Sequence, residues 1–406
     1  MNFVFWQSYL MCHQAAYIRA LADRPDCQVK WVVEQTLPTH YRTRGYPIPA
    51  LGKVEAVIAP DQRRVHELLA DDPQLTTHVF MGLRRSRLSG RAFHASKAYP
   101  VKRLLLTENR FERNWRLPLR WGLYLYQALI SRRYLDRVLC MGYGGVWGGR
   151  SWLRLCGYPD RMISPFAYTS EEGIDEATGG DATPASAFAH GSKPGDIVFV
   201  GQLVRRKGLD LLLRALADPH AFPGYRLTVV GSGPEETSLK RLADELALGR
   251  QVSFVGNLDH AAVGTLIATH QMLVLPSRFD GWGAVVNEAL LAGTPVVCSD
   301  RAGASDLVLG SGFGKTFRSG DVSDLKRSIR GCLAISASPT HHAAWWEFRD
   351  CMRGPSVAQY LLDLMSSVEH NAPMPVAPWL AASEGASSGR KRPVDTSETA
   401  QECASL

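Results

Sequence analysis

Two carboxylates stand eight residues apart around a glycine-bearing turn. Asp280 precedes Gly281-Trp282-Gly283, and Glu288 follows inside a helical pattern. The amino terminus of a helix has unpaired N–H groups and a positive dipole end, which attract phosphate or sugar oxygens. A carboxylate about two turns further on is suited to accept hydrogen bonds from a ribose diol. The simpler alternative is that Asp280 caps the helix and Glu288 is exposed to solvent.

A second group of residues carries positive charge. Gly201-Gln202 begins a turn that contains three adjacent cations, Arg205, Arg206 and Lys207. Fixed cations of this kind can bind a diphosphate, although a solvated basic turn is the alternative. The turn matches neither GxxxxGK[ST] nor GxGxxG. Gly231-Ser232-Gly233 lets backbone approach a ligand closely, and a simple turn explains it equally well.

Both groups follow short apolar runs that are typical of buried parallel strands. The second half of the chain has such runs at Ile197 to Gly201, Arg226 to Gly231, Val252 to Gly256, Met272 to Leu275 and Pro295 to Cys298. Helical patterns separate them, so right-handed crossovers into one parallel sheet are expected. In such sheets ligands bind at the carboxyl edge, where the polar turns lie.

The first half alternates less clearly, with strand patterns at Met1 to Trp6 and Val29 to Val33. This alternation favours a second doubly wound α/β domain. Residues 171–195 are rich in Gly, Ala, Ser, Thr and Pro and are predicted to be a linker. The expected organisation is a first Rossmann-like domain at 1–170, the linker at 171–195, a second Rossmann-like domain at 196–352, a helix returning to the first domain at 353–370, and a disordered tail at 371–406.

Composition is that of a water-soluble, two-domain protein. The chain has 406 residues, 45% hydrophobic and 21% charged, with a net charge of +7 and eight cysteines without a CxxC pair. Scattered cysteines favour reduced thiols in a reducing compartment. No convincing secretory signal and no run of about 20 apolar residues is present. A cytoplasmic protein is therefore predicted, with any membrane contact peripheral.

Residues 84–120 hold many arginines and lysines, and residues 115–126 add aromatic and apolar side chains. One interpretation is a solvated basic helix whose aromatic residues are core. Another is a face that rests on anionic headgroups, or an entry for a phosphorylated acceptor. Nucleic acid is not expected, because no zinc finger, RNP motif or helix-turn-helix signature is present.

Four segments in order, FVGQLVRRKG, LTVVGSGPE, VSFVGN and LVLPSRFDGWGAVVNEALLAGTPVV, resemble the carboxyl-terminal domain of family 4 retaining glycosyltransferases (glycosyl transferases group 1). The resemblance covers roughly residues 196–310 and is specific as a set. It implies the GT-B fold, in which two doubly wound parallel-sheet domains face each other across a cleft. The family's mark is a pair of glutamates separated by seven residues, which appears here as Asp280 and Glu288.

The resemblance implies that Glu288 binds the ribose of a nucleotide-sugar, that the loop from Asp280 holds its sugar and diphosphate, and that Lys207 meets the diphosphate. The family's usual arginine is Gln202 here, and Arg205 or Arg206 is expected to replace its charge. Catalytic roles are thus expected for Asp280, Lys207 and Arg206. Donor binding is expected for Gly201, Gln202, Arg205, Gly231, Gly233, Asn257, Leu258, Gly281, Trp282, Gly283 and Glu288.

On the acceptor side, SYLMCHQAAYIRAL looks like the first loop and helix of such enzymes, which makes His13 and Gln14 candidates. A structural role for His13 is the alternative. Glu108 and Asn109 follow an apolar run at an expected cleft edge.

The function implied is retaining transfer of a sugar from a nucleotide-sugar to a saccharide or lipid-linked acceptor, as in bacterial surface polysaccharide or glycolipid synthesis. No metal or other cofactor is expected, the nucleotide-sugar being a co-substrate. A non-catalytic nucleotide-sugar-binding scaffold is the main alternative. A nucleotide-sugar epimerase is less favoured, because no cleft acid and base could be identified for it.

Overall fold

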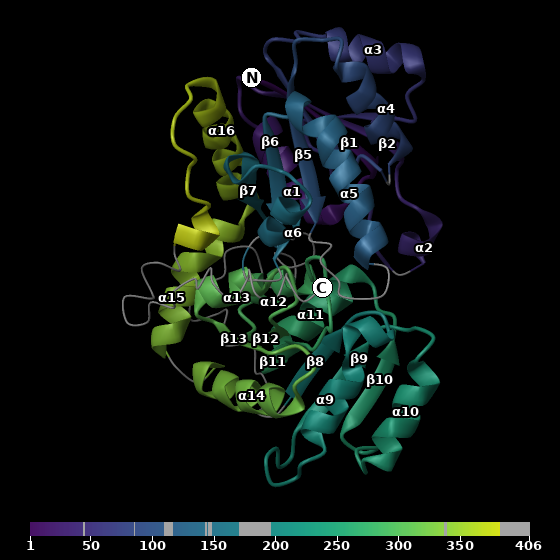
Figure 1. Ribbon diagram of the computed structural model, residues 1–406. Helices are drawn as coiled ribbons and strands as arrows, with labels where there is room; N and C mark the ends of the chain where they lie inside the picture. Colours follow the sequence, from purple (N-terminus) through teal and green to yellow (C-terminus); the bar gives the residue numbers. More distant parts are fainter. Residues whose placement is uncertain are drawn as a thin grey trace.

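The computed structural model describes residues 1–43, 45–84, 86–108, 117–142, 144, 148–169, 196–336 and 339–381. It consists of two α/β domains, each built on a parallel sheet (Figure 1). The prediction of two doubly wound domains is confirmed. The predicted linker at 171–195 and the candidate Asn109 lie outside the described residues.

The first sheet has the strand order β3-β2-β1-β4-β5-β6-β7, with every neighbouring pair parallel. Its strands are β1 (Asn2–Tyr9), β2 (Gln28–Gln35), β3 (Glu55–Ile58), β4 (Thr76–Met81), β5 (Lys102–Glu108), β6 (Arg137–Met141) and β7 (Ile163–Phe166). The helices in this half are α1 (Cys12–Ala22), α2 (Thr39–Arg42), α3 (Gln62–Ala70), α4 (Arg87–Ser96), α5 (Leu117–Ser131) and α6 (Gly149–Leu155).

Both faces of the first sheet are covered, which explains why four consecutive residues of β1, Phe3 to Trp6, are apolar and buried. Phe3 and Phe5 pack toward α1, whereas Val4 and Trp6 belong to a separate core under α3, α4 and α6. The strand order reverses between β1 and β4. Side chains that follow these two strands therefore lie at the switch point of the sheet, where a crevice forms.

The second sheet has the order β10-β9-β8-β11-β12-β13 and is also parallel. Its strands are β8 (Asp196–Val200), β9 (Arg226–Val230), β10 (Val252–Gly256), β11 (Met272–Leu275), β12 (Val296–Ser299) and β13 (Gly314–Phe317). The helices are α9 (Leu209–Leu216), α10 (Glu236–Glu245), α11 (His260–Thr269), α12 (Val285–Leu291), α13 (Ser305–Ser311), α14 (Val322–Ser336) and α15 (Pro339–Arg349). Here the order reverses between β8 and β11.

The last long helix, α16 (Gly354–Glu369), leaves the second domain and packs against α1 of the first (Figure 1). The Tyr360 hydroxyl donates a hydrogen bond to the Pro165 carbonyl oxygen at 3.0 Å. The prediction of a disordered tail at 371–406 is wrong for 371–381, and residues 382–406 lie outside the described residues. Ala377 and Trp379 are buried there, and the Trp379 ring lies 5.4 Å from that of Tyr360. Because the segment is rich in proline, its composition does not indicate that Ala377 and Trp379 would be buried.

The two domains also contact each other directly. The Trp282 indole donates to the Asn287 side-chain oxygen at 2.7 Å, and the Asn287 amide donates to the Tyr168 carbonyl oxygen at 2.9 Å. Elsewhere the Gly144 N–H donates to the Asp306 carboxylate at 2.7 Å. Burial raises the pKa of Asp306 to about 6, although this hydrogen bond opposes the shift.

Two further predictions concern cysteines and membrane spans. Seven cysteines lie in the described residues; all have free thiols and six are buried, consistent with their use as small apolar side chains. Within the described part of the chain, none of the helices combines the length and apolarity needed to cross a bilayer.

Replacing Trp379 with alanine tests whether the segment after α16 is part of the fold. Because the indole is only 2% exposed, Trp379→Ala is expected to reduce the free energy of unfolding by about 3–5 kcal/mol. Urea unfolding measures this. The matched control is Val376→Ala, since Val376 is 62% exposed in the same segment and a change within about 0.5 kcal/mol is expected. Equal effects of the two substitutions would contradict the packing described.

Candidate functional site

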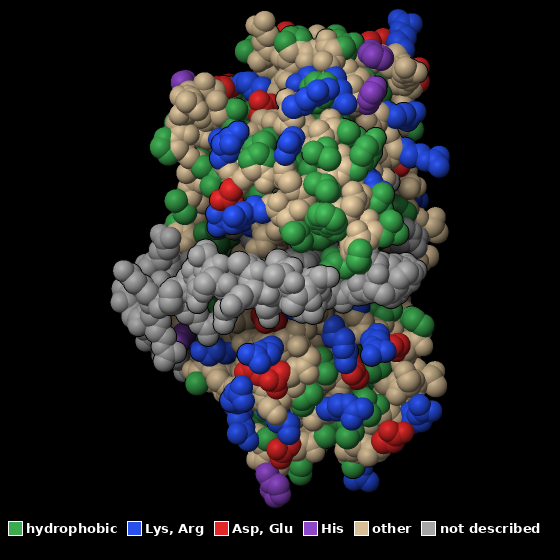
Figure 2. Space-filling view, viewed as in Figure 1, with side chains coloured by type: hydrophobic (Ala, Val, Ile, Leu, Met, Phe, Trp, Pro, Cys, Tyr) green, Lys and Arg blue, Asp and Glu red, His purple; other side chains and the backbone are tan. Residues whose placement is uncertain are grey.

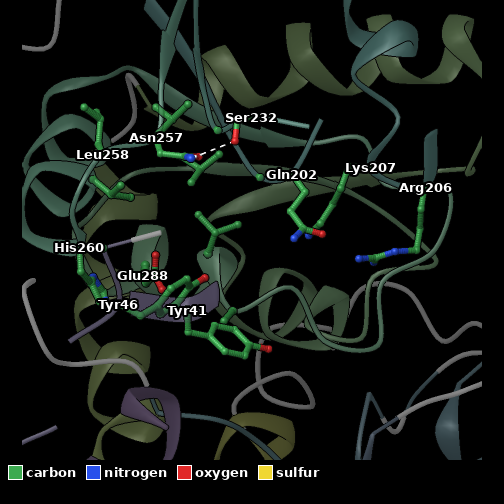
Figure 3. Close-up of a pocket in the computed structure, with 18 residues that line it drawn as sticks. Tyr41, Tyr46, Gln202, Arg206, Lys207, Ser232, Asn257, Leu258, His260 and Glu288 are labelled. Carbon is green, nitrogen blue, oxygen red and sulfur yellow. Dashed lines mark hydrogen bonds between the residues drawn. The ribbon is translucent and has the colours of Figure 1, made fainter. Parts of the chain in front are cut away.

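A cavity of about 290 Å³ lies between the domains at the carboxyl edge of the second sheet. Its walls come from the turns after β8, β9 and β10, from the first turns of α11 and α12, and from a loop of the first domain (Figure 3). Ligands of open parallel sheets bind at this edge, so the cavity lies where the sequence predicts a binding site.

Eight of the residues predicted to bind or act on a ligand line this cavity. They are Gly201, Gln202, Arg206, Lys207, Gly231, Asn257, Leu258 and Glu288. Six others do not appear in its wall: Arg205, Gly233, Asp280, Gly281, Trp282 and Gly283. Of these, Trp282 is 4% exposed and joins the two domains through Asn287, so its indole has a structural partner.

The glycines after β8 and β9 allow neighbouring turns to pack backbone against backbone. Gly231 has a φ of +126°, and a Cβ atom there would lie 2.0 Å from the Gly201 carbonyl oxygen. A Cβ atom at Gly233 would lie 2.4 Å from the Leu203 carbonyl oxygen. Side chains at either position would push these turns apart. The glycines therefore shape the wall of the cavity through contacts within the protein.

Asp280 is buried and forms an ion pair with the basic turn. The Lys207 ammonium donates to Asp280 Oδ2 at 2.5 Å, and Arg206 Nη1 lies 3.5 Å from Oδ1. Burial by itself raises the pKa of Asp280. The positive charges of Lys207 and Arg206, with hydrogen bonds from Lys207 and the Trp282 backbone, outweigh it and hold the pKa below its ordinary value. Asp280 is therefore ionised at neutral pH.

The helix-capping alternative for these acids is wrong. The N-cap residue of α12 is Ala284, and no side chain caps that helix. Glu288 is 7% exposed and lies in the cavity wall rather than on a solvated helix face. One oxygen of its carboxylate lies 4.0 Å from His13 Nδ1.

Arg278 fixes the backbone of the basic turn, η3 (Arg205–Lys207). Arg278 forms a two-point ion pair with Asp210 at 2.6 and 2.7 Å. Its Nη1 also donates to the Arg205 carbonyl oxygen at 3.0 Å, and its backbone N–H donates to the Arg206 carbonyl oxygen at 2.8 Å. With the backbone fixed in this way, the side chains of Arg206 and Lys207 enter the cavity wall and that of Arg205 does not. Of the two arginines expected to replace the charge absent at Gln202, Arg206 lines the cavity and Arg205 does not.

Three aromatic residues of this wall were not predicted. Tyr41 and Tyr46 come from the first domain, and His260 comes from α11 (Figure 3). The Tyr46 ring lies 6.3 Å from His260 and 5.4 Å from Tyr41. The sequence does not predict these contacts, because nothing in the pattern of residues 41–49 shows which part of the other domain they will approach.

Gly45 brings this loop against the second domain. It has a φ of +77°, and a Cβ atom there would lie 2.7 Å from Asp259 Cα and 3.0 Å from the Leu258 carbonyl oxygen. Backbone of one domain therefore packs directly on backbone of the other at the rim of the cavity.

A second cavity, of about 260 Å³, lies at the carboxyl edge of the first sheet. Glu108 is in its wall and accepts a hydrogen bond from the Tyr168 hydroxyl at 2.7 Å. Tyr41 lines both this cavity and the larger one. The two spaces therefore share a wall near the switch point of the first sheet.

The other acceptor-side candidates are placed differently. Gln14 is fully buried, bonded to Gln7 at 2.6 Å and to Tyr17 at 2.9 Å, and lines neither cavity. His13 is also buried and lines neither; its ring lies between those of Tyr46 and Tyr168, at 5.9 Å from each. Burial lowers the pKa of His13, although Glu288 opposes this, so His13 is neutral at pH 7.

Comparison with known proteins agrees with this geometry. Residues 185–343 match the family model described as Glycosyl transferases group 1. A glycogen synthase of Mycobacterium tuberculosis (strain CDC 1551 / Oshkosh) is 31% identical over 172 residues, which are 42% of this chain and 41% of that protein. A D-inositol 3-phosphate glycosyltransferase of Mycobacterium bovis (strain BCG / Pasteur 1173P2) is 33% identical over 150 residues, 35% of this chain and 30% of that one. The matched region thus spans less than half of either relative.

Among solved structures, Anabaena Alr3699/HepE in complex with UDP has a TM-score of 0.63 at 16% identity, covering 90% of this chain and all of that one. A sucrose-phosphate synthase of Thermosynechococcus elongatus has a TM-score of 0.60 at 17% identity, covering 92% of this chain and all of that one. With two parallel sheets facing one cavity, the architecture is settled. The chain has the GT-B fold. Its second domain is similar to that of group 1 glycosyl transferases.

The ion pair at Asp280 makes a prediction about stability and pH. A carboxylate with a lowered folded pKa stabilises the fold above its unfolded pKa, and this contribution disappears as pH falls through the folded value. Asp280→Asn also leaves Lys207 without its buried partner, so a loss of about 3 kcal/mol is expected at pH 7. The difference from the unsubstituted protein should begin to shrink below about pH 4, where the carboxylate of the unfolded chain becomes protonated, and should continue to shrink as pH falls through the lower pKa of the folded state.

Urea unfolding at pH 7 and at about pH 2.5, well below the unfolded pKa, measures both differences. Glu236→Gln is the control, because its ion pair with Lys240 is exposed on a helix, and a change below about 0.5 kcal/mol is expected. A loss that is the same at the two pH values would show that the ionised form of Asp280 is not what stabilises the fold.

Proposed function

We propose that this protein is a retaining glycosyltransferase that moves a sugar from a nucleotide-sugar to a saccharide or lipid-linked acceptor, in the synthesis of a bacterial surface polysaccharide or glycolipid. One observation carries the proposal. Arg206, Lys207 and Glu288 converge on a single cavity at the carboxyl edge of the domain that is similar to group 1 glycosyl transferases. Two cations and a carboxylate complement a diphosphate and a ribose diol.

In this proposal the nucleoside lies against the turns after β9 and β10, and Glu288 accepts hydrogen bonds from its ribose. Lys207 and Arg206 contact the diphosphate. As the bond from the sugar to the diphosphate breaks, negative charge grows on the leaving phosphate, and these fixed cations stabilise it more than they stabilise the intact donor. The Anabaena protein of the same fold has been solved with UDP and with UDP and glucose, which supports a donor of this class.

Asp280 holds Lys207 in place while the donor is absent. Its carboxylate is bound to the cations of η3, so its first role is to position them. The proposed reaction proceeds by departure and attack on the same face of the sugar, with a donor phosphate oxygen accepting the acceptor's proton. The protein's own cations supply the charge stabilisation, and the proposal uses no metal or other cofactor.

In this proposal the acceptor binds in the second cavity, where the Glu108 carboxylate and the hydroxyl groups of Ser8 and Tyr9 can bind sugar hydroxyls. Tyr41 stands in the wall that this space shares with the donor cavity, and closure of the domains would bring the two substrates together. The free thiols of the described residues support a reducing, cytoplasmic location.

A donor panel tests the function. Thermal shift with UDP-, GDP- and ADP-glucose is expected to raise the Tm with one base, and Glu288→Gln is expected to lose most of that shift because the ribose loses its acceptor. The same panel with and without a saccharide acceptor separates the reactions. Release of nucleotide that requires acceptor supports transfer, interconversion of the donor sugar indicates an epimerase, and binding without turnover indicates a scaffold.

The placement of the two arginines makes a sharper prediction. Arg206→Ala is expected to raise the donor KM about tenfold, which corresponds to about 1.4 kcal/mol of lost binding. Arg205→Ala is the matched control on the same turn, and its KM should change less than about twofold because its side chain is outside the cavity wall. The reverse order of effects, or none in either variant, would contradict the assignment of Arg206 to the diphosphate.

A further inference from the structure

Helix α5 (Leu117–Ser131) presents its apolar side chains to solvent. The buried residues of this helix are Gln127, Ala128 and Ser131, which are polar or small. Its exposed face carries Leu119, Trp121, Leu123, Tyr126, Leu129 and Ile130. Figure 2 shows these green side chains gathered over α5 on the first domain. A group of large apolar side chains on one surface marks an interaction site rather than ordinary exposure.

Specific contacts fix α5 in this orientation. The Gln127 amide donates to the Tyr158 hydroxyl at 3.2 Å, and the Tyr124 ring packs on Trp152. On the outer side, the Trp121 indole donates to the Leu155 carbonyl oxygen at 2.9 Å. Leu155 is itself 42% exposed and extends the apolar surface. The interpretation that the aromatic residues of this stretch are core is therefore wrong for Trp121 and Tyr126.

The charge around this surface is positive. Residues 117–131 contain no Asp or Glu, and arginines stand at positions 120, 132 and 133. Arg132 donates to the Gly157 carbonyl oxygen, and Arg133 donates to the Tyr134 hydroxyl. Both acceptors are neutral, so these two hydrogen bonds leave the positive charges uncompensated. The helix thus combines protruding apolar groups with a cationic border.

We propose that the exposed face of α5 docks on an anionic lipid bilayer. Leucine, isoleucine, tryptophan and tyrosine side chains enter the boundary between headgroups and acyl chains, while arginines meet the anionic headgroups. A second copy of the chain fits this face less well. In a twofold contact the same surface meets itself, so the arginines of the two copies would face one another without acidic partners from the helix.

The position of α5 connects this surface to the second cavity. Tyr124 and Gln127 belong to the same helix and line that cavity. A substrate bound there would be separated from the docked bilayer by the width of α5, about 10 Å. If the proposed glycosyl transfer holds, the acceptor is therefore the headgroup of a lipid whose acyl chains stay in the membrane. This last step rests on the proposed function, whereas bilayer docking does not.

Vesicle co-sedimentation tests the proposal with the full chain and no substrate. Vesicles of phosphatidylcholine with 30% phosphatidylglycerol are compared with phosphatidylcholine alone, at low and at moderate salt. We expect binding to the anionic vesicles that weakens as salt rises, because screening reduces headgroup attraction. The double variant Leu119→Asp, Tyr126→Asp is expected to bind at least tenfold more weakly. These side chains are 67% and 63% exposed, so the fold should tolerate the change.

The matched control is Leu309→Asp in the second domain, where Leu309 is 61% exposed; its binding should equal that of the unsubstituted chain. Absence of binding to anionic vesicles at low salt would overturn the proposal. So would equal losses in the double variant and the control, or sedimentation equilibrium showing a dimer that the double variant abolishes. A chain that binds vesicles but transfers no sugar would refute the proposed function and leave the docking surface standing.

Discussion

The ion pair between Lys207 and Asp280 is the interaction on which the larger cavity depends. It joins the turn after β8 to the loop after β11, and these are the two strands between which the order of the second sheet reverses. Desolvation offsets much of the attraction between the two charges, so the pair adds less stability than its short distance suggests. It also contributes position: without the carboxylate, the ammonium would have no fixed direction beside the cavity.

The residues that form this site are supported in turn by contacts with residues outside it. Arg278, paired with Asp210, fixes the backbone of the basic turn. The turn then presents Arg206 and Lys207, while α12 presents Glu288 from the opposite wall. Both domains contribute to the space that results, and aromatic contacts run from Tyr41 through Tyr46 to His260 across their boundary. The site is a product of the interface as much as of either sheet.

The second domain could be predicted well from sequence because its signals are local. Short apolar runs that end in glycine turns define β8, β9 and β10, and the carboxyl-edge rule then gathers Lys207 and Glu288. Contacts between distant segments could not be predicted in this way. The loop containing Tyr46 and the anchor at Trp379 acquire their roles only through the partner they meet, and helical periodicity does not say which face of α5 is turned outward.

The backbone contact at Gly45 limits how closely the two domains can approach each other. Where backbone rests on backbone, the gap between two bodies has a lower limit that no rotamer change can alter. The depth to which the first domain can close over a ligand is therefore set at this point by the path of the main chain. Enlarging side chains in the wall would fill the space, and trimming them would loosen it, but neither would bring the domains closer together. Accommodation of a differently sized ligand would require a change in the length or course of the loop itself.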